Sequence, residues 1–320
     1  MKFKRLYLLI FFIILLVINL LLYFEYKIVR NNLLSEIKTP NLNQLISTSS
    51  NPKIPTTKII LAGDVMLGRT VMTKSLSLED LSYPFRKVAD KLKDGDVVFI
   101  NLESPIVYNC PKIETGFIFC ASPEMLNGLS LAGVDIVTLA NNHIDNFGQV
   151  GIDDTKKYLK EVGIEWTNET NLVIKNINNT KFGFLGLNFT FKIPTEKDLN
   201  IIKESKGNVD VLILGVHWGV EYSLNPTVNQ KAWAKSFIES GADVVVGHHP
   251  HWVQESGYIE GKPVYYSLGN FVFDQMWSEE TKKGVVVELS FMGKELTDQQ
   301  VKNVYMSSWA QPEFVKEESY

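Results

Sequence analysis

Short apolar runs alternate with helical patterns between residues 58 and 290, and this alternation limits the fold more than any other feature. The apolar runs predict strands at 58–62, 97–100, 135–139, 172–175, 182–187, 209–216, 243–246, 264–266 and 285–290. Helices are predicted at 123–132, at 149–162 and from Pro226 to Gly241. In the last helix, an apolar stripe is expected to face the core: Val228, Ala232, Trp233, Phe237 and Ile238. Repeated strand–helix units predict an α/β fold with functional groups in the loops after strand ends.

Polar motifs follow five of these predicted strands. They contribute Asp64 in AGD, Glu103 in NLE, Asn142 and His143 in NNH, His217 in HWG, and His248, His249 and His251 in GHHPH. All five histidines of the chain lie in these motifs. Imidazole is a common transition-metal ligand and carries protons near neutral pH, and its mixture with oxygen donors suits Mn, Fe or Zn better than Ca. The sequence therefore predicts a transition-metal site at the strand ends.

The number of candidate ligands is compatible with a two-metal centre. Such a centre uses a bridging carboxylate, an amide oxygen and several histidines to activate a water molecule, so it needs no nucleophile from the protein. The sequence contains no G-x-S-x-G motif, no P-loop and no H-E-x-x-H motif. The pattern therefore favours metal-dependent hydrolysis at a phosphoryl or acyl centre.

Six longer motifs occur in order between about residues 58 and 292: LAGDVMLGR, NLESPI, TLANNHIDNFGQVGI, GVHWGVEY, GADVVVGHHPHWVQ and YSLGNFVFD. Together they resemble the CapA family of poly-γ-glutamate capsule-synthesis proteins, a branch of the calcineurin-like metallophosphoesterase superfamily. The resemblance implies a four-layer α/β/β/α sandwich with the metals at one edge. It also implies an anionic polymer such as poly-γ-glutamate as substrate, and capsule-synthesis subunits as further partners.

The resemblance also implies a role for individual residues. Asp64 would be the first metal carboxylate, Glu103 the bridging carboxylate and Asn142 the amide ligand, while His143 would be the general acid. The remaining ligands of two divalent ions, Mn, Fe or Zn, would come from His217, His248, His249 and His251. The choice between His248 and His249 stays open, because both fit a superfamily spacing.

The chain departs from the superfamily pattern at Met66, where phosphoesterases usually carry a histidine, and Glu103 replaces an aspartate. Thioether sulfur is a poor ligand for hard metals, so this departure disfavours ordinary phosphatase activity. Arg69 is either a bidentate ligand for a substrate carboxylate or a surface residue. Asp145 either orients His143 or caps a turn, and Gly269 is expected to shape the YSLGN turn. Three functions follow: a hydrolase of a cell-surface polymer, a non-catalytic polymer-binding assembly subunit, or a phosphoesterase.

The N-terminal residues predict a membrane anchor. Residues 6–24 include one clearly polar side chain, Asn19, and would span roughly 28 Å as a helix, close to the thickness of a bilayer core. Basic residues precede them and no small-residue cleavage site follows, which favours an uncleaved signal anchor over a cleaved secretory signal. We therefore expect a single-pass cell-membrane protein with an anchor and its flanks at 1–30, a linker at 31–57, and an extracytoplasmic CapA-like metallophosphoesterase-fold domain at 58–320.

Charge and cysteine content limit the partners and the compartment. The chain has a net charge of −4, and because residues 1–30 carry +4, the remainder carries −8. This excess argues against nucleic acid as a partner, and it repels a polyanion except where a metal reverses the local field. Cys110 and Cys120 bracket a nine-residue loop. A disulfide and two free thiols are both compatible with this spacing.

Overall fold

A computed structural model describes residues 16–30 and 55–316 of the chain. The chain divides into two compact units, with the boundary between Lys53 and Ile54. Residues 16–30 form a helix with exposed side chains. In these two described ranges, no helix is both long enough and apolar enough to cross a membrane. The first part of the predicted anchor and most of the predicted linker lie outside the described residues.

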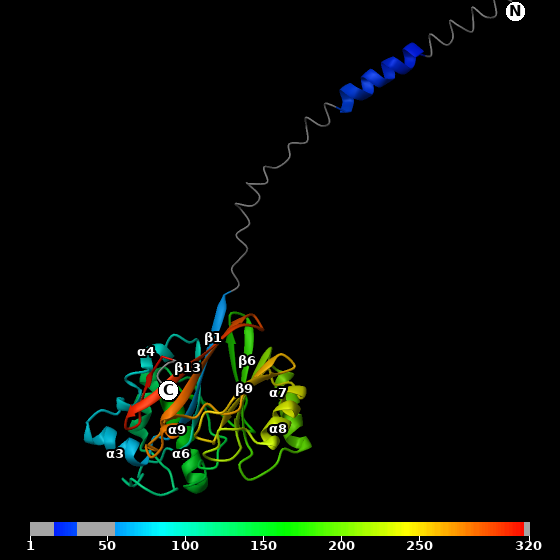
Figure 1. The fold of residues 1–320 in the computed structure, drawn as a ribbon. Helices are drawn as coiled ribbons and strands as arrows, with labels where there is room; N and C mark the ends of the chain where they lie inside the picture. The colour runs from blue at the N-terminus through cyan, green and yellow to red at the C-terminus, as the bar shows by residue number, and fades with distance from the viewer. Residues whose placement is uncertain (1–15, 31–54, 317–320) are drawn as a thin grey trace, which may run out of the picture. The chain divides into compact units, whose positions relative to one another are not determined.

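The second unit contains two β-sheets (Figure 1). The first sheet has the order β14-β13-β12-β1-β2-β3-β4, with β11 paired to β1. Its strands are β1 (Thr56–Val65), β2 (Val97–Leu102), β3 (Ile136–Thr138), β4 (Glu165–Thr167), β11 (Asn270–Val272), β12 (Lys283–Met292), β13 (Glu295–Ser308) and β14 (Gln311–Phe314). The second sheet has the order β5-β6-β7-β8-β10-β9. Its strands are β5 (Val173–Ile177), β6 (Thr180–Asn188), β7 (Val211–His217), β8 (Val244–His248), β9 (Ser256–Ile259) and β10 (Lys262–Tyr265).

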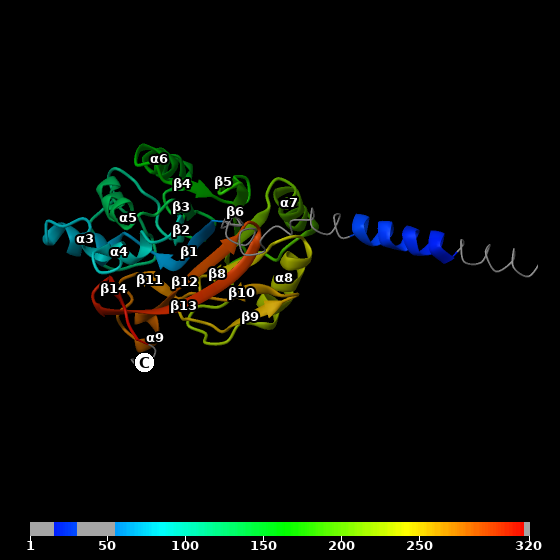
Figure 2. The ribbon, with the colours of Figure 1, turned by 90° about the horizontal axis from the view of Figure 1, so that it is seen from above.

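Helices cover the outer faces of both sheets, as the view from above shows (Figure 2). Those on the first sheet are α3 (Arg69–Ser77), α4 (Ala89–Leu92), α5 (Leu126–Ala132) and α6 (Gly148–Glu161), with the 3-10 turns η1 (Tyr83–Phe85) and η2 (Pro123–Met125). Those on the second sheet are α7 (Glu196–Lys206) and α8 (Val228–Glu239), while the short α9 (Glu279–Lys282) precedes β12. A separate apolar core fills the space between the sheets, where the rings of Phe99 and Phe184 lie 5.4 Å apart. These layers confirm the predicted α/β class.

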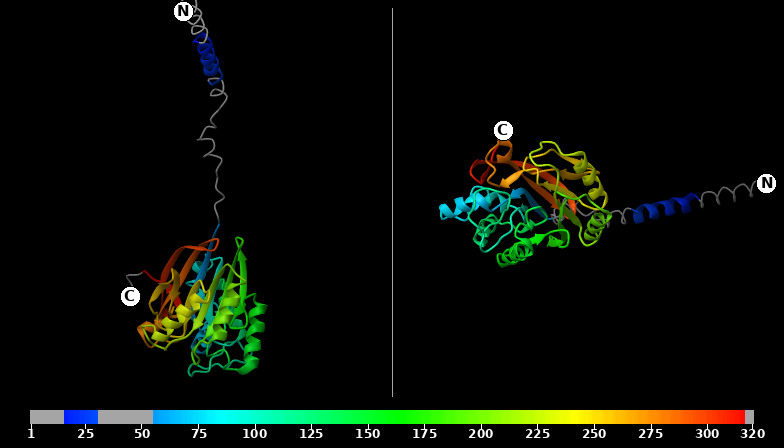
Figure 3. Two further views of the ribbon diagram at one scale, coloured as in Figure 1. Left: turned by 90° about the vertical axis from the view of Figure 1, so that its right-hand side faces the viewer. Right: turned by 90° about the horizontal axis from the view of Figure 1, so that it is seen from below.

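The register of the parallel strands brings their polar ends together. Asp64 of β1 is paired with Asn101 of β2, and His217 of β7 is paired with His248 of β8. Parallel strands end at a common edge, so the loops that follow them gather there. The two sheets face each other in the further views of the fold (Figure 3). The strand-end motifs predicted from the sequence therefore meet at one edge of the two sheets.

The buried face of α8 differs from the predicted apolar stripe. Val228 is 84% exposed, whereas the helix buries Ala234, Phe237 and Ile238 together with Gln230. The Gln230 side chain bonds to the backbone N–H of Thr227 and donates to another buried side chain, so its polar atoms are satisfied inside the protein. In the predicted stripe, Phe237 and Ile238 are buried as expected and Trp233 packs against the same core. The prediction was wrong for Val228 and Ala232, which are exposed.

Candidate metal centre

Two buried carboxylates form the base of the site. Asp64 lies near the end of β1 and Glu103 follows β2, and neither side chain is exposed to solvent. Asn101 joins them, because its Nδ2 donates to Asp64 Oδ1 at 2.9 Å and lies 3.1 Å from Glu103 Oε2. Asn101 was absent from the predicted ligand set, although it belongs to the same NLE motif. Its amide holds the two carboxylates at a defined separation.

The GHHPH histidines surround Asp64. His248 Nδ1 lies 3.2 Å from Asp64 Oδ1, and His251 Nδ1 lies 3.3 Å from Oδ2. The backbone N–H of His249 donates to Oδ2 at 3.2 Å. His249 and His251 have φ angles of 95° and 60°, in the left-handed region that costs non-glycine residues energy and is found at functional sites. The strained turn therefore holds two histidine rings and one backbone N–H against the Asp64 carboxylate.

The second sheet contributes His217, which lies at the end of β7 and is buried. Its Nε2 lies 2.8 Å from Asn142 Oδ1, so the amide predicted to be a ligand is in the site. Its ring centroid lies 4.8 Å from that of His249. The structure thus gathers the seven predicted metal ligands and His143: Asp64, Glu103, Asn142, His143, His217, His248, His249 and His251.

The residues present fit a divalent metal ion. One ligand atom each from Asp64, Glu103 and His217 lie within 4.8 Å of one another. Three buried atoms of the cluster have no hydrogen-bond partner among residues 16–30 and 55–316: Glu103 Oε1, His248 Nε2 and His249 Nδ1. Leaving such atoms unsatisfied costs about 1–3 kcal/mol each. A cation at this position would satisfy them with the oxygen and nitrogen donors that transition metals accept.

The electrostatics of the cluster also suit a cation. Burial, with the nearby charge of Asp64, raises the pKa of Glu103 well above its usual value. Burial also opposes ionisation of Asp64, but hydrogen bonds with His248 and His251 outweigh it and hold that pKa well below its usual value. Burial disfavours the charged form of His251, yet Glu103 and Asp64 raise its pKa to about 9. The two buried acidic groups therefore both favour a positive charge beside them, and little water reaches them to supply a substitute.

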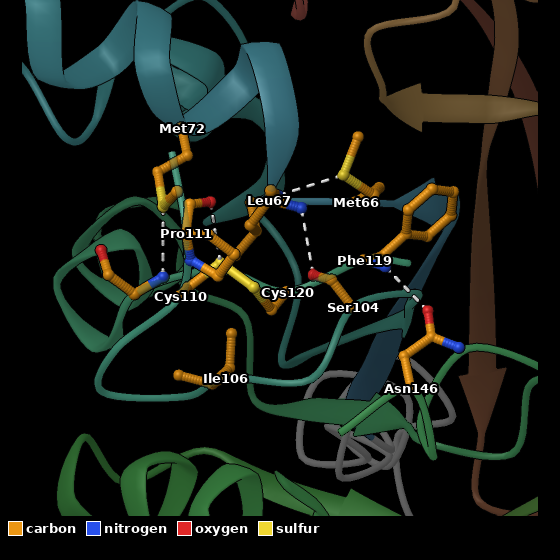
Figure 4. Close-up of a disulfide and its surroundings, with 12 residues drawn as sticks. Met66, Leu67, Met72, Ser104, Ile106, Cys110, Pro111, Phe119, Cys120 and Asn146 are labelled. Atoms are coloured by element: carbon orange, nitrogen blue, oxygen red, sulfur yellow. Dashed lines mark hydrogen bonds between the residues drawn. A yellow bond between two sulfur atoms is a disulfide. The ribbon is translucent and has the colours of Figure 1, made fainter. Parts of the chain in front are cut away.

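His143 is held in one tautomer at the side of this cluster. Asn146 Oδ1 accepts a hydrogen bond from the backbone N–H of Phe119 at 2.7 Å, which fixes it as an acceptor (Figure 4). His143 Nδ1 lies 3.2 Å from the same oxygen and so carries the proton. Its Nε2, 3.8 Å from Glu103 Oε1, is left as an acceptor. Burial lowers the pKa of His143 to about 4, and the Phe119 ring stacks on it at 3.9 Å.

Two of the sequence interpretations change in the structure. The Asp145 side chain is exposed, and the residue beside His143 is Asn146. Arg69 donates hydrogen bonds to the carboxylate of Asp274 from Nε, at 3.1 Å, and from Nη2. An internal carboxylate therefore pairs with the guanidinium that was expected to bind a substrate carboxylate. Pairing across 205 residues cannot be read from local sequence.

Met66 and the YSLGN turn also have defined places. Met66 is buried in the core of the first sheet, and its Sδ accepts a hydrogen bond from Gly68 N at 3.1 Å (Figure 4). Gly269 has φ +70° and its carbonyl oxygen accepts from Asp64 N at 3.0 Å, as expected for a turn that needs glycine. Asn270 was missed: its Oδ1 lies 2.9 Å from His251 Nδ1. The sequence feature that could have indicated Asn270 is its place next to a glycine at a strand, which it shares with Asp64 and His248.

A disulfide joins Cys110 and Cys120 and closes the loop beside the centre (Figure 4). The structure therefore selects one of the two states left open by the sequence. The residue next to Cys120 is Phe119, whose ring and backbone both position the His143–Asn146 pair. Within the same loop, Gly116 O accepts a hydrogen bond from Arg69 Nη1 at 2.6 Å. The disulfide thus stabilises one wall of the site.

We expect the double variant Cys110→Ser/Cys120→Ser to lose about 2–3 kcal/mol of unfolding free energy, because the open chain has more conformational freedom when unfolded. Urea denaturation would measure this loss. A matched control is wild-type protein in dithiothreitol, which should show the same shift, while the double variant should not respond to the reductant. An unchanged urea midpoint in the double variant would contradict the stabilising role.

Comparison with known proteins gives three findings. The family model described as "Bacterial capsule synthesis protein PGA_cap" matches residues 58–275. The chain is 32% identical over 257 residues to "Capsule biosynthesis protein CapA" of Bacillus anthracis, covering 71% of this chain and 62% of that protein. It is 28% identical over 250 residues to "PGA biosynthesis protein CapA" of Bacillus subtilis (strain 168), covering 70% and 65%. The chain thus matches less than two thirds of the length of these relatives.

A solved structure shows a similar fold. The crystal structure of a hypothetical protein from Thermus thermophilus covers 77% of this chain and 98% of its own, with a TM-score of 0.52 and 15% sequence identity. At this identity the likeness concerns the two-sheet architecture alone.

Proposed function

Because the chain belongs to the bacterial capsule synthesis protein (PGA_cap) family, we propose that it is a metal-dependent hydrolase of an anionic cell-surface polymer. The bond cut is a γ-glutamyl amide of poly-γ-glutamate, or a related amide bond of peptidoglycan. The names of the Bacillus relatives, capsule and PGA biosynthesis proteins, support the polymer. The observation that carries the chemistry is the buried cluster of Asp64, Glu103 and His217, in which Glu103 Oε1 has no hydrogen-bond partner among the described residues.

The proposal includes a place at the cell membrane. The apolar residues 6–24 anchor the chain, residues 31–57 form the tether and residues 58–320 act outside the membrane. The support is the length of the apolar run and the basic residues before it. A disulfide in the domain agrees with an oxidising compartment.

The metal is a divalent transition-metal ion, with two ions as the full complement. Asp64, Glu103 and His217 hold it, and the further ligands come from Asn142, His248, His249 and His251. When bound, the metal supplies Lewis acidity and an activated water molecule.

The protein's own groups handle the proton. The bare Nε2 of His143 accepts the proton of the attacking water and then passes it to the leaving amine. This refines the role expected from the resemblance, because the tautomer set by Asn146 makes His143 an acceptor before it becomes a donor. The stacked Phe119 ring excludes water from one face of the imidazole.

A second candidate function is a polymer-binding subunit of a capsule-synthesis complex that uses the same site without turnover. The word "biosynthesis" in the relatives' names favours it. Phosphoesterase activity has less support, because Met66 replaces an imidazole and its sulfur is engaged with Gly68.

The test uses the full chain purified in detergent. Its metal content is measured, and it is incubated with poly-γ-glutamate, peptidoglycan fragments and phosphate esters, with His143→Ala as the inactive control. Metal together with cleavage of an amide-linked polymer is the expected result. Bound metal without turnover of any substrate would favour the function as an assembly subunit. Turnover of phosphate esters alone would contradict the proposal that the substrate is a polymer. A chain that cannot be loaded with metal would remove the basis of all three functions.

The residue that orients His143 can be tested directly. Asn146→Ala should lower turnover by about 10-fold to 100-fold, the usual cost of losing an orienting hydrogen bond, while metal content stays unchanged. Because orientation is at issue, kcat should fall more than KM rises. The matched control is Asp145→Ala, which removes the neighbouring exposed carboxylate and should retain full turnover. Full turnover in Asn146→Ala with reduced turnover in Asp145→Ala would instead assign the orienting role to Asp145.

A further inference from the structure

A cavity of about 340 Å³ lies beside the metal centre. Its lining includes Glu114 and Phe117 of the disulfide-closed loop, Tyr222 after β7, Gln275 and Trp277 after β11, and Trp309 between β13 and β14. Segments far apart in the sequence therefore build a single concave surface. None of the catalytic or metal-binding roles proposed for this chain uses it.

The aromatic rings of this cavity are exposed to an unusual degree. Phe117 is 82% exposed, Trp277 59% and Trp309 47%. The ring of Tyr222 meets that of Trp277 edge to face, with centroids 4.8 Å apart. Exposed aromatic side chains gathered around a cavity with a few polar groups are typical of a ligand site. The rings offer flat apolar faces, and the exposed carboxylate of Glu114 offers hydrogen-bond acceptors at the edge. The buried Gln275 supports the Tyr222 hydroxyl, because its amide already bonds to Asn270 and Tyr222.

The cavity shares walls with the metal centre on two sides. The Tyr222 ring lies 6.0 Å from that of His251, and its hydroxyl accepts from Gln275 Nε2 at 3.1 Å. On the other side, the guanidinium of Arg69 lies 4.6 Å from the centroid of the Phe119 ring, which stacks on His143. A chemical group held in the cavity would therefore be adjacent to the bond that the centre attacks.

The charges of the lining select against a carboxylate. Arg69 is the cation of the lining, and Asp274 already pairs with its guanidinium. Glu114 remains as a carboxylate, so the lining as a whole carries a net charge of −1, from one basic and two acidic residues. The part of the chain after residue 30 also carries −8 against −4 for the whole. The lining therefore offers a glutamyl carboxylate no unpaired cation, whereas a neutral ring with hydroxyl groups needs none.

We propose that this cavity is a subsite for a neutral sugar ring. The C–H faces of the sugar pack on the rings of Trp277 and Trp309, and its hydroxyl groups donate to the Glu114 carboxylate. The inference rests on the proposed function in one respect: the sugar belongs to the polymer that is cut. Of the two substrates proposed above it therefore selects peptidoglycan, because poly-γ-glutamate contains no sugar. The amide bond attacked by the centre would then lie next to a glycan, as it does in peptidoglycan.

The disulfide makes this subsite rigid. The disulfide between Cys110 and Cys120 closes this loop (Figure 4). Two lining residues of the subsite, Glu114 and Phe117, lie within the closed loop. A wall fixed before binding lowers the entropy that binding must overcome. The binding free energy of a sugar that makes few contacts is therefore more favourable when the aromatic rings are already in place.

Titration calorimetry on the full chain in detergent tests the subsite, with tetra-N-acetylchitotetraose as the neutral sugar and γ-linked tetraglutamate as the charged peptide. We expect saturable binding of the sugar, and a loss of about tenfold in affinity in Trp277→Ala and in Trp309→Ala. The matched control is Tyr258→Ala on β9, a ring that is 60% exposed outside the cavity lining, and it should bind the sugar as wild type does.

The outcomes separate the subsite from the hydrolase. Sugar binding that is absent, or that is unchanged in both tryptophan variants, overturns the subsite. So does tetraglutamate binding that both variants abolish, because the cavity would then hold the peptide. Tryptophan-dependent sugar binding that survives chelator treatment supports the subsite, even if the chain proves to hydrolyse no polymer.

Discussion

Asp64→Asn is expected to lower metal affinity by more than about 100-fold and to abolish turnover. Loss of a residue that only supports a ligand costs about 10-fold to 100-fold, and Asp64 contacts the metal site directly. It also accepts from Asn101 and faces His248 and His251, so removing its charge loosens the whole cluster. The measurements are metal content after purification and calorimetric titration with Zn²⁺ and Mn²⁺.

The control for this prediction is Asp145→Asn, which removes an exposed carboxylate a few residues from the site. It should bind metal as wild type does. Circular dichroism would show whether Asp64→Asn keeps its fold, because a buried, charged partner has been replaced by a neutral one of equal size. A folded Asp64→Asn protein with full metal content would mean that the metal site lies elsewhere.

Gly247→Ala is expected to lower the free energy of unfolding by about 3 kcal/mol or more, a large part of the stability of an ordinary domain. A Cβ at this position would lie 1.9 Å from the carbonyl oxygen of Tyr266 and 2.5 Å from Trp218 Nε1. That oxygen already accepts the Trp218 N–H at 2.9 Å, so neither group can move without breaking a buried hydrogen bond. Because Gly247 precedes His248, the displacement would also disturb the histidine turn.

Thermal and urea denaturation would measure this effect, with Gly257→Ala as the control. No heavy atom of the described residues lies within 4 Å of a Cβ built at Gly257, so that variant should unfold as wild type does. Equal midpoints for the two variants would show that β8 can move away from β10 and that the close approach is not required.

The sequence located most of the regular elements. Every predicted strand overlaps an observed one. Most of them are buried parallel strands, which are continuous apolar runs. β13 (Glu295–Ser308) was missed, since most of its residues are exposed or half-buried and polar. β11 (Asn270–Val272) was missed because three residues carry no period. Both strands are defined by pairing with β12 or β1, which local sequence does not encode.

The candidate site was also predicted only in part from the sequence. The sequence identified the donor types and their strand ends, and the register brought them together as expected. It could not assign neighbours to side chains at the edge of the site, where Asn146 lies beside His143 and Asp274 pairs with Arg69. A difference of one residue in a turn, or a contact across 205 residues, is decided by the path of the chain.

The amino-acid sequence by itself determined the strand–helix alternation, the placement of acidic, amide and imidazole groups at strand ends, and the apolar N-terminal run. These are local properties, and burial of alternating apolar segments follows from them. Only the tertiary structure decided which groups meet, which tautomer His143 adopts, that Cys110 and Cys120 are bonded, and that exposed aromatic rings surround a cavity beside the metal centre. Hydrogen bonds and cavities depend on distances of a few ångströms between segments far apart in the chain, and those distances exist only after the two sheets pack.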